Sequence, residues 1–455
     1  MMKTSQIDLT KGKILPTILR FAWPIMISNI FQQLYNTADT MIVGNYLGEQ
    51  ALAAVGATSA IFELIIGFAL GVGNGMGIVI ARHYGAKNEE ELKRSVAATV
   101  VIGLILSGLV MLVGNLGLRP LLQLLGTPAN ILEQSYSYIY LIMMGVGVTF
   151  AYNLGAGLLR AIGDSLVALY FLIFSACLNI ALDLFFITQL HLGVQSAGLA
   201  TILSQGLSAV LCFLYIARRV PVLVPKRHHL VWEKGLYQDL LGQGLSMGLM
   251  FSIVSIGTVI LQTAINGFGV LIIAAQTTAR RIMAFSLQPL TATAASMTTF
   301  VSQNLGAKQF DRIYQGVKKA SLIALVWGII VTILLHLFSP ALISWISGSD
   351  EPELIANATP YLKLGTPFYP ILGCLFILRN TLQGLGRKVT PLVSSLIELV
   401  GKVIFVIAII PQVGYVGVML CEPLIWVPMT AQLFVAFRRH PFIQEGKRQA
   451  RLASI

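Results

Sequence analysis

Carboxylates inside apolar segments are the residues of this chain whose chemistry is most informative. Five of the 19 acidic residues fall in such segments: Asp39, Glu63, Asp183, Glu398 and Glu422. A carboxylate at the centre of a bilayer costs about 2.5–3.5 kcal/mol on insertion scales, so each of the five is a functional candidate by default. Two such groups that face one another can hold a hard cation or share a proton. The first chemistry to consider is therefore the reversible capture of a positive ion.

Asp39 ends a polar stripe on one face of a predicted helix. The stripe occupies positions i, i+3, i+4 and i+7, which lie on the same side of a helix; its members are Gln32, Tyr35, Asn36 and Asp39. Because the rest of this segment is apolar, the stripe should line a cavity or the interior of a helix bundle and face away from lipid.

Asp183 has a similar setting, with Asn179 one turn earlier on the same helical face and Thr201 in the following apolar segment. If the helices bring these side chains to Asp39, they offer two carboxylates, an amide oxygen and a hydroxyl. Such a donor set suits Na⁺ or another hard cation, and the two carboxylates could instead share a proton. A static hydrogen-bond network that holds the helices together is the structural alternative.

The second half of the chain carries a different set of charges. Glu398 and Lys402 are four residues apart on one predicted helix, where they can neutralise each other. Arg379 and Glu422 could pair across helices, either as a structural contact or as a gate. We treat these four residues as a possible polar network and give Glu63 no role.

These residues must be positioned by membrane-spanning helices. The 455 residues are 56% hydrophobic and only 11% charged, against roughly 25% charged residues in ordinary soluble proteins. The mean hydropathy is +0.79. A span needs about 20 apolar residues, and the polar breaks predict twelve helices, centred near Ile30, Phe68, Leu104, Met143, Phe174, Val210, Ser252, Leu290, Val326, Leu372, Val403 and Trp426.

The net charge of +12 is explained by the distribution of basic residues among the loops. Most lysines and arginines fall on one side of the predicted membrane, which is typical of cytoplasmic loops. The protein is therefore predicted to lie in the plasma membrane with both termini in the cytoplasm. A nucleic-acid partner is not needed to explain the positive charge. The Glu89–Glu91 run and the preceding Arg82–Lys87 segment are predicted to form a solvated loop on that side.

Several function classes are disfavoured by what the chain contains. Its four cysteines lie in apolar segments without metal-ligand spacing, its histidines form no triad-like pattern, and no phosphate-binding GxxxxGK[ST] loop occurs. We therefore expect neither an enzyme nor an ATP-driven pump, and no cofactor. No removable signal peptide is predicted at the amino terminus.

An internal repeat divides the chain into two halves. Gly85-Ala86-Lys87 aligns with Gly306-Ala307-Lys308 at an offset of 221 residues, and Leu159–Gly163 aligns with Leu382–Gly386 at 223. Each half holds six spans, so the halves enter the membrane in the same orientation. The predicted domains are an N-lobe at residues 1–217, a cytoplasmic linker at 218–237, a C-lobe at 238–437 and a basic tail at 438–455.

The two halves differ at the candidate cation site. Asp39 aligns with Ile260, and Asp183 aligns with apolar residues such as Val406. Cation coupling is thus predicted to be confined to the N-lobe. Pro24, which aligns with Leu245, interrupts the helical hydrogen bonds of the first span. It is either a hinge that moves with the ionisation of Asp39 or a static bend.

Taken in order, these motifs resemble those of the multidrug and toxic compound extrusion (MATE) transporters, in the prokaryotic branch. The resemblance covers about residues 12 to 440 and rests on Ala22-Trp23-Pro24, Tyr35-Asn36-Thr37-Ala38-Asp39, the two Gly-Ala-Lys loops, Leu159–Asp164, Asn179 with Asp183, Leu382–Gly386 and Glu422-Pro423.

This resemblance implies a fold, a function and a set of site residues. The fold would be two six-helix bundles arranged in a V, and the function would be export of amphipathic, often cationic drugs in exchange for Na⁺ or H⁺. The implied cation site is Asp39, Asn179, Asp183 and Thr201. The residues implied to line the substrate cavity with Asn36 are Gln32, Tyr35, Tyr138 and Asn153. Spans seven and ten lack the carboxylates that other members use for a site in the C-lobe.

The overall prediction is an all-α membrane protein that acts as a cation-coupled drug antiporter by alternating access. Its partners would be drug-like small molecules and the lipid bilayer, and the protein is expected to be a monomer. A flippase for lipid-linked saccharides, from the same wider superfamily, is the alternative. In that case Arg280 and Arg281 could meet a pyrophosphate group.

Overall fold

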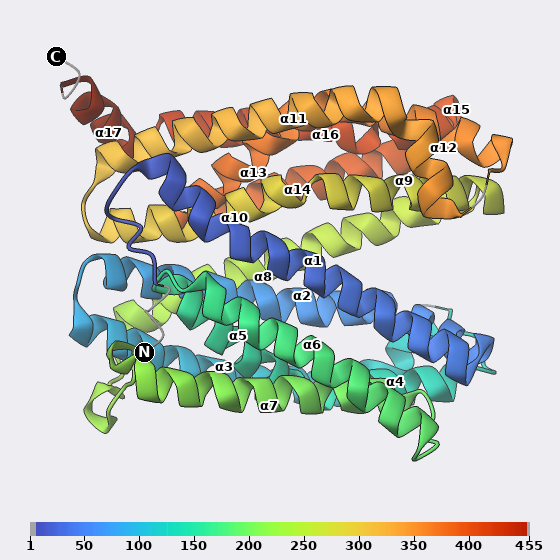
Figure 1. The fold of residues 1–455 in the computed structure, drawn as a ribbon, viewed down its shortest axis with the longest axis horizontal. Coiled ribbons are helices and arrows are strands. Elements are labelled where there is room, and N and C mark those ends of the chain that lie inside the picture. The colour runs from blue at the N-terminus through green and yellow to red at the C-terminus, as the bar shows by residue number, and fades with distance from the viewer. Residues whose placement is uncertain (1–5, 125, 349, 453–455) are drawn as a thin grey trace. The chain divides into compact units, whose positions relative to one another are not determined.

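The computed structural model describes residues 6–124, 126–348 and 350–452, and within these ranges the regular secondary structure is entirely helical, without a strand (Figure 1). All twelve predicted span centres lie within helices. The prediction of an all-α polytopic membrane protein is confirmed.

The helices follow one another with short connections. Those of the first half are α1 (Ile14–Leu47), α2 (Glu49–Gly85), α3 (Glu89–Leu124), α4 (Leu132–Met144), α5 (Val146–Ala161), α6 (Ser165–Thr188) and α7 (Gln195–Arg219). After the short turns η1 (Pro221–Leu223) and η2 (Arg227–His229) come α8 (Lys234–Asn266), α9 (Val270–Ser286), α10 (Gln288–Gly306), α11 (Phe310–Ser347), α12 (Pro352–Gly365), η3 (Thr366–Phe368), α13 (Tyr369–Gly384), α14 (Val389–Ile404), η4 (Phe405–Ile409), α15 (Ile410–Val413), α16 (Tyr415–Arg438) and α17 (Pro441–Leu452).

Two of the predicted spans are bent pairs of helices. Among the described residues, ten segments are long and apolar enough to cross a membrane, and two further pairs bring the number to twelve. The pair α4–α5 bends by 48° at Gly145, and α9–α10 bends by 49° at Leu287. Pro289 is the second residue of α10, in the first turn, where its missing N–H costs no helical hydrogen bond.

Packing divides the chain into two compact units. Of the described residues, those of 6–8 and 27–251 form unit 1, and those of 9–26 and 252–452 form unit 2. The helices α1 and α8 therefore belong to both units: each is continuous, and each changes unit part of the way along. In α1 the change falls between Met26 and Ile27, just after Pro24.

Within unit 1, α2 and the first half of α8 cross with their backbones in close contact. Gly71 and Gly75 of α2 face Gly244 and Gly248 of α8. A Cβ atom added at Gly75 would lie 2.3 Å from the Gln243 carbonyl oxygen. Small residues four positions apart permit such close helix crossings in membranes.

The repeat seen in the sequence recurs in the backbone conformation. Lys87 and Lys308, which end the two Gly-Ala-Lys motifs, both adopt positive φ, at 55° and 58°. Gly163 and Gly386 have φ of 90° and 80°. In each half the Gly-Ala-Lys motif thus ends one long helix with the same left-handed turn before the next helix begins.

The segment predicted to be a solvated loop is mostly helical, so that prediction was wrong. Arg82–Gly85 complete α2, and Glu89–Glu91 form the first turn of α3, so only Ala86–Asn88 connect the two helices. The acidic run is favoured at this place because negative side chains stabilise the positive end of the helix dipole.

Candidate functional site

The polar stripe of α1 faces the helices α6 and α7. The Tyr35 hydroxyl lies 3.3 Å from the Thr201 hydroxyl of α7. Thr201 donates its own proton to the Ala197 carbonyl at 2.9 Å, so its oxygen accepts the hydrogen bond from Tyr35. This bond fixes the stripe against α7 within unit 1.

Asn179 links α6 to the same hydroxyl. Its Nδ2 donates to Thr201 Oγ1 at 3.3 Å, and both side chains are buried. Because the amide nitrogen is held by Thr201, the amide oxygen is oriented away from α7. Asn179 therefore presents an acceptor oxygen on the helical face that also carries Asp183, one turn later.

Asp39 and Asp183 form the centre of the site. Their carboxyl groups lie within hydrogen-bonding reach of each other, and Asp183 is fully buried. Two adjacent carboxylates repel one another unless a cation or a proton lies between them, and the repulsion is strongest where water is excluded. The pair is therefore the place in unit 1 where a bound positive charge would gain the most.

Four acceptor oxygens at this centre are buried without a hydrogen-bond donor among the described residues. They are Asp39 Oδ1, Asn179 Oδ1 and both carboxylate oxygens of Asp183. Buried polar atoms are almost always hydrogen-bonded, because an unmade bond costs about 1–3 kcal/mol. A set of unsatisfied oxygens and no unsatisfied donor fits a cation or a proton as the missing partner.

Two tyrosines lie near this pair, Tyr35 of α1 and Tyr138 of α4. Tyr138 is buried, lies near Tyr35, and is close enough to Asp39 and Asp183 for their charges to act on it. Tyr152 of α5 is in turn a neighbour of Tyr35. Tyr152 was not among the predicted residues, although its position just before Asn153 repeats the Tyr35-Asn36 pair and could have suggested it.

The other residues predicted to line the cavity make local contacts. The Gln32 amide donates to Asn36 Oδ1 at 3.3 Å along α1, and Asn153 donates to the Thr149 carbonyl one turn earlier on α5 at 2.8 Å. Asn36 is exposed and Gln32 and Asn153 are half-buried. Pro24 lies within α1, which continues as a helix on either side of it.

Unit 2 contains the charge network expected around Glu398. Lys402 is almost completely buried and lies 3.0 Å from Glu398 and 3.1 Å from Glu422. Arg379 is 3.9 Å from Glu398 and donates to the Ser394 hydroxyl at 3.1 Å. We expected Arg379 to pair with Glu422. In the structure Glu422 pairs with Lys402 instead, and Arg379 lies beside Glu398.

This network differs from the pair in unit 1 because each of its two carboxylates already lies beside two cations. Arg280 of α9 lies close enough to Glu422 to interact with its charge. Cationic and anionic groups alternate from Arg379 to Arg280, and a buried pair of this kind is strongly destabilised when one partner is removed. The network therefore holds α13, α14 and α16 together without an added ion.

Comparison with known proteins gives one consistent result. A family model described as MatE matches residues 24–185 and again residues 247–407. The second match begins 223 residues after the first, which is the offset of the internal repeat.

Curated relatives match along most of their length. The probable multidrug resistance protein YoeA of Bacillus subtilis (strain 168) is 28% identical, with 99% of this chain and 100% of the relative covered. The FAD transporter of Shewanella oneidensis is 24% identical over 84% of this chain and 85% of its own.

Solved structures match in fold. The crystal structure of MATE in complex with MaL6 has a TM-score of 0.86 at 24% identity, with 99% of both chains covered. The outward-facing conformation of a multidrug resistance MATE family transporter of the MOP superfamily has a TM-score of 0.84 at 24% identity and the same coverage.

Proposed function

The chain belongs to the MatE family, and on that premise we propose that it exports amphipathic drugs in exchange for Na⁺ or H⁺ held between Asp39 and Asp183. It is a multi-pass membrane transporter and not an enzyme. Export of drugs is supported by relatives named as multidrug resistance proteins, such as YoeA.

The observation that carries the proposed coupling is the buried carboxyl pair with its unsatisfied oxygens. An ion that binds here relieves the repulsion between two carboxylates, so its affinity differs between any two conformations that hold the carboxylates at different separations. Such a difference in affinity couples ion flow to a conformational change. Alternating access between the predicted lobes, residues 1–217 and 238–437, would then move the drug outward.

Tyr35, Tyr138 and Gln32 would contact the drug on the side of the site that α1 and α4 form. Aromatic faces attract organic cations, and the polar stripe supplies hydrogen-bond partners. Pro24 would act as the hinge of α1. The protein is proposed to act as a monomer in the plasma membrane with both termini in the cytoplasm.

The flippase alternative has less support. A pyrophosphate would need several neighbouring cations that are not already paired with carboxylates. Arg280, the residue that favoured this alternative, lies beside Glu422 and the Lys402 network.

Transport by reconstituted protein tests the proposal. A Na⁺ gradient and a pH gradient are imposed separately on proteoliposomes loaded with a fluorescent organic cation. Asp39→Asn and Asp183→Asn should each abolish gradient-driven exchange while the protein remains folded, because one neutral amide ends the mutual repulsion that an ion would relieve. Glu133→Gln, which changes an exposed carboxylate of α4 in the same unit, is the matched control and should keep exchange. Wild-type coupling in both aspartate variants would refute the proposal.

A further inference from the structure

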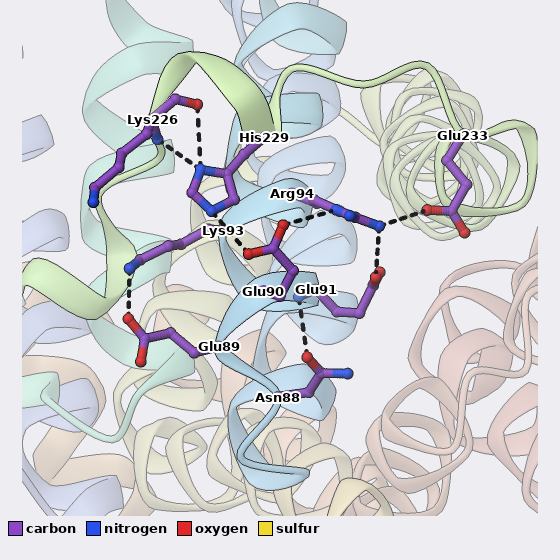
Figure 2. Close-up of polar contacts among 9 residues, drawn as sticks. All are labelled: Asn88, Glu89, Glu90, Glu91, Lys93, Arg94, Lys226, His229 and Glu233. Carbon is purple, nitrogen blue, oxygen red and sulfur yellow. Dashed lines mark hydrogen bonds and ion pairs between the residues drawn. The ribbon is translucent and has the colours of Figure 1, made fainter.

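The linker between the two halves lies in unit 1, where it meets the first turn of α3. Figure 2 shows His229 of η2 pointing toward Glu90, with Lys226 on one side of the ring and Arg94 beyond the carboxylate. The His229 side chain is 3% exposed. The neighbouring His228 ring is exposed, and its centre lies 4.0 Å from that of His229.

Three potential metal ligands gather at this contact. His229 Nε2 lies 3.2 Å from Glu90 Oε2, and one ligand atom from each of Glu90, His228 and His229 falls within 4.8 Å of the others. Zinc bonds of about 2.0–2.2 Å in a tetrahedron place ligand atoms roughly 3.3 Å apart. The Glu90–His229 pair already has this spacing, and the exposed His228 side chain has room to close the remaining distance.

The second ring nitrogen of His229 has the partner that a metal-binding histidine needs. His229 Nδ1 lies 2.8 Å from the Lys226 backbone nitrogen and 3.2 Å from the Lys226 carbonyl oxygen. Without a metal, the Lys226 N–H donates to Nδ1, and Nε2–H donates to Glu90. With a metal on Nε2, the ring takes the other tautomer: Nδ1 carries the proton and donates it to the Lys226 carbonyl, and the Lys226 N–H gives up its bond to the ring. A carbonyl partner of this kind orients most histidine ligands.

Glu90 can serve a metal without leaving a charge unpaired. In the structure it lies 3.3 Å from Arg94. Arg94 also has Glu91 at 3.1 Å and Glu233 at 3.8 Å, so two carboxylates remain for the guanidinium when Glu90 turns to an ion (Figure 2). The positive charge nearest the site is therefore already neutralised by other partners.

We propose that Glu90, His228 and His229 form a binding site for a divalent transition metal, with zinc as the best fit. Two imidazoles and one carboxylate match the preferences of zinc, and three protein ligands leave a fourth position for water. The bound ion fastens the linker to the start of α3. The linker is already held in the core of unit 1 by Leu223 near its start and by Leu236 and Tyr237 at its end, so the metal adds an anchor between them.

The site controls access to the part of the linker between Leu223 and the two histidines. Lys226 and Arg227 are exposed and lie immediately before the histidines, so trypsin can cut after either residue when the linker opens. A metal that holds His228 and His229 against Glu90 stabilises the closed form of the linker, and the population of the open form falls by the same factor. Metal binding is therefore readable as protection from cleavage, independently of transport.

The purified full-length protein, stripped with a chelator and held in detergent, provides the test. We expect one Zn²⁺ per chain by calorimetry, a visible absorption band when Co²⁺ replaces Zn²⁺, and slower tryptic cleavage after Lys226 and Arg227. His228→Asn and Glu90→Gln should each weaken Zn²⁺ binding by at least about 10–100-fold, as for the loss of a group that supports a metal site. The protection from trypsin should disappear in both variants.

His191→Asn is the matched control, since His191 is an exposed histidine outside the cluster and its φ of 52° tolerates asparagine. This variant should bind zinc as the wild type does. Absence of zinc binding in the wild type would overturn the proposal, as would unchanged affinity in His228→Asn. Because His228 is exposed, that variant decides the matter even if Glu90→Gln is poorly folded.

Discussion

At the scale of single residues, Thr201 offers a way to separate sodium from proton coupling. A sodium ion needs several oxygen ligands, whereas a shared proton needs only the two carboxyl groups. Thr201→Val keeps the shape of the side chain, removes its oxygen and frees Asn179 from its present orientation. In sodium-driven exchange, the Na⁺ concentration for half-maximal rate should rise about fivefold, which corresponds to about 1 kcal/mol.

Proton-driven exchange by the same variant should stay close to the wild-type rate. Thr188→Val is the control, because the Thr188 hydroxyl also bonds a carbonyl one turn earlier on α6 but lies at the end of that helix. A Thr201→Val variant whose dependence on Na⁺ matched that of the wild type would show that sodium binding does not depend on this hydroxyl or on the orientation that it gives Asn179.

His440, between α16 and α17, links stability to pH. Burial, together with the positive charge of Arg387, lowers the pKa of His440 from 6.5 to about 4. The unfolded chain therefore binds a proton more readily than the folded one between these values. The contribution of neutral His440 is fully present above about pH 6.5 and is lost as the pH falls toward 4. At most it amounts to roughly 3 kcal/mol.

The melting temperature of the wild type should thus fall as the pH is lowered from 6.5 to 4. His440→Gln removes the titrating group, so its melting temperature should decline less over this range. Equal slopes for the two proteins would contradict the assignment of this pH dependence to His440.

At the scale of elements, the crossing of α2 and α8 depends on glycine at particular positions. Gly75→Ala places a methyl group 2.3 Å from the Gln243 carbonyl oxygen, and backbone at such a contact cannot yield as a side chain does. We expect a loss of about 1–3 kcal/mol, seen as a lower melting temperature in detergent.

Gly73 of the same helix is the control, since a Cβ atom at Gly73 would meet nothing within 4 Å. Gly73→Ala should leave the melting temperature unchanged or raise it slightly, because alanine favours the helix. If both variants lowered the melting temperature by a similar amount, the α2–α8 crossing would not be as close as in the structure.

At the scale of the whole molecule, the sequence predicted the number of spans, their centres and the repeat. These properties follow from local hydropathy and from self-similarity, which a single chain displays. The approach of Asp39 to Asp183 could also be predicted, because unpaired carboxylates in apolar helices have few stable environments.

Other features depend on contacts that no local pattern records. The bends at Gly145 and Leu287 follow from how the helices pack around them. The meeting of His228 and His229 with Glu90 joins segments far apart in the chain, and each segment alone is typical of a solvated surface. For the same reason the sequence predicted only one partner of Lys402. Glu398 lies on the same helix, whereas the second partner, Glu422, lies on another helix.

The division of α1 and α8 between the two units has a consequence for a chain that is cut in its linker. Cleavage after Arg227 would produce two fragments, and the later one would carry the half of α8 that packs with α2. The earlier one would carry residues 9–26, which pack with unit 2. Each fragment would thus hold a piece of the other's interior, so the nicked protein should stay together as a non-covalent heterodimer instead of falling into independent halves.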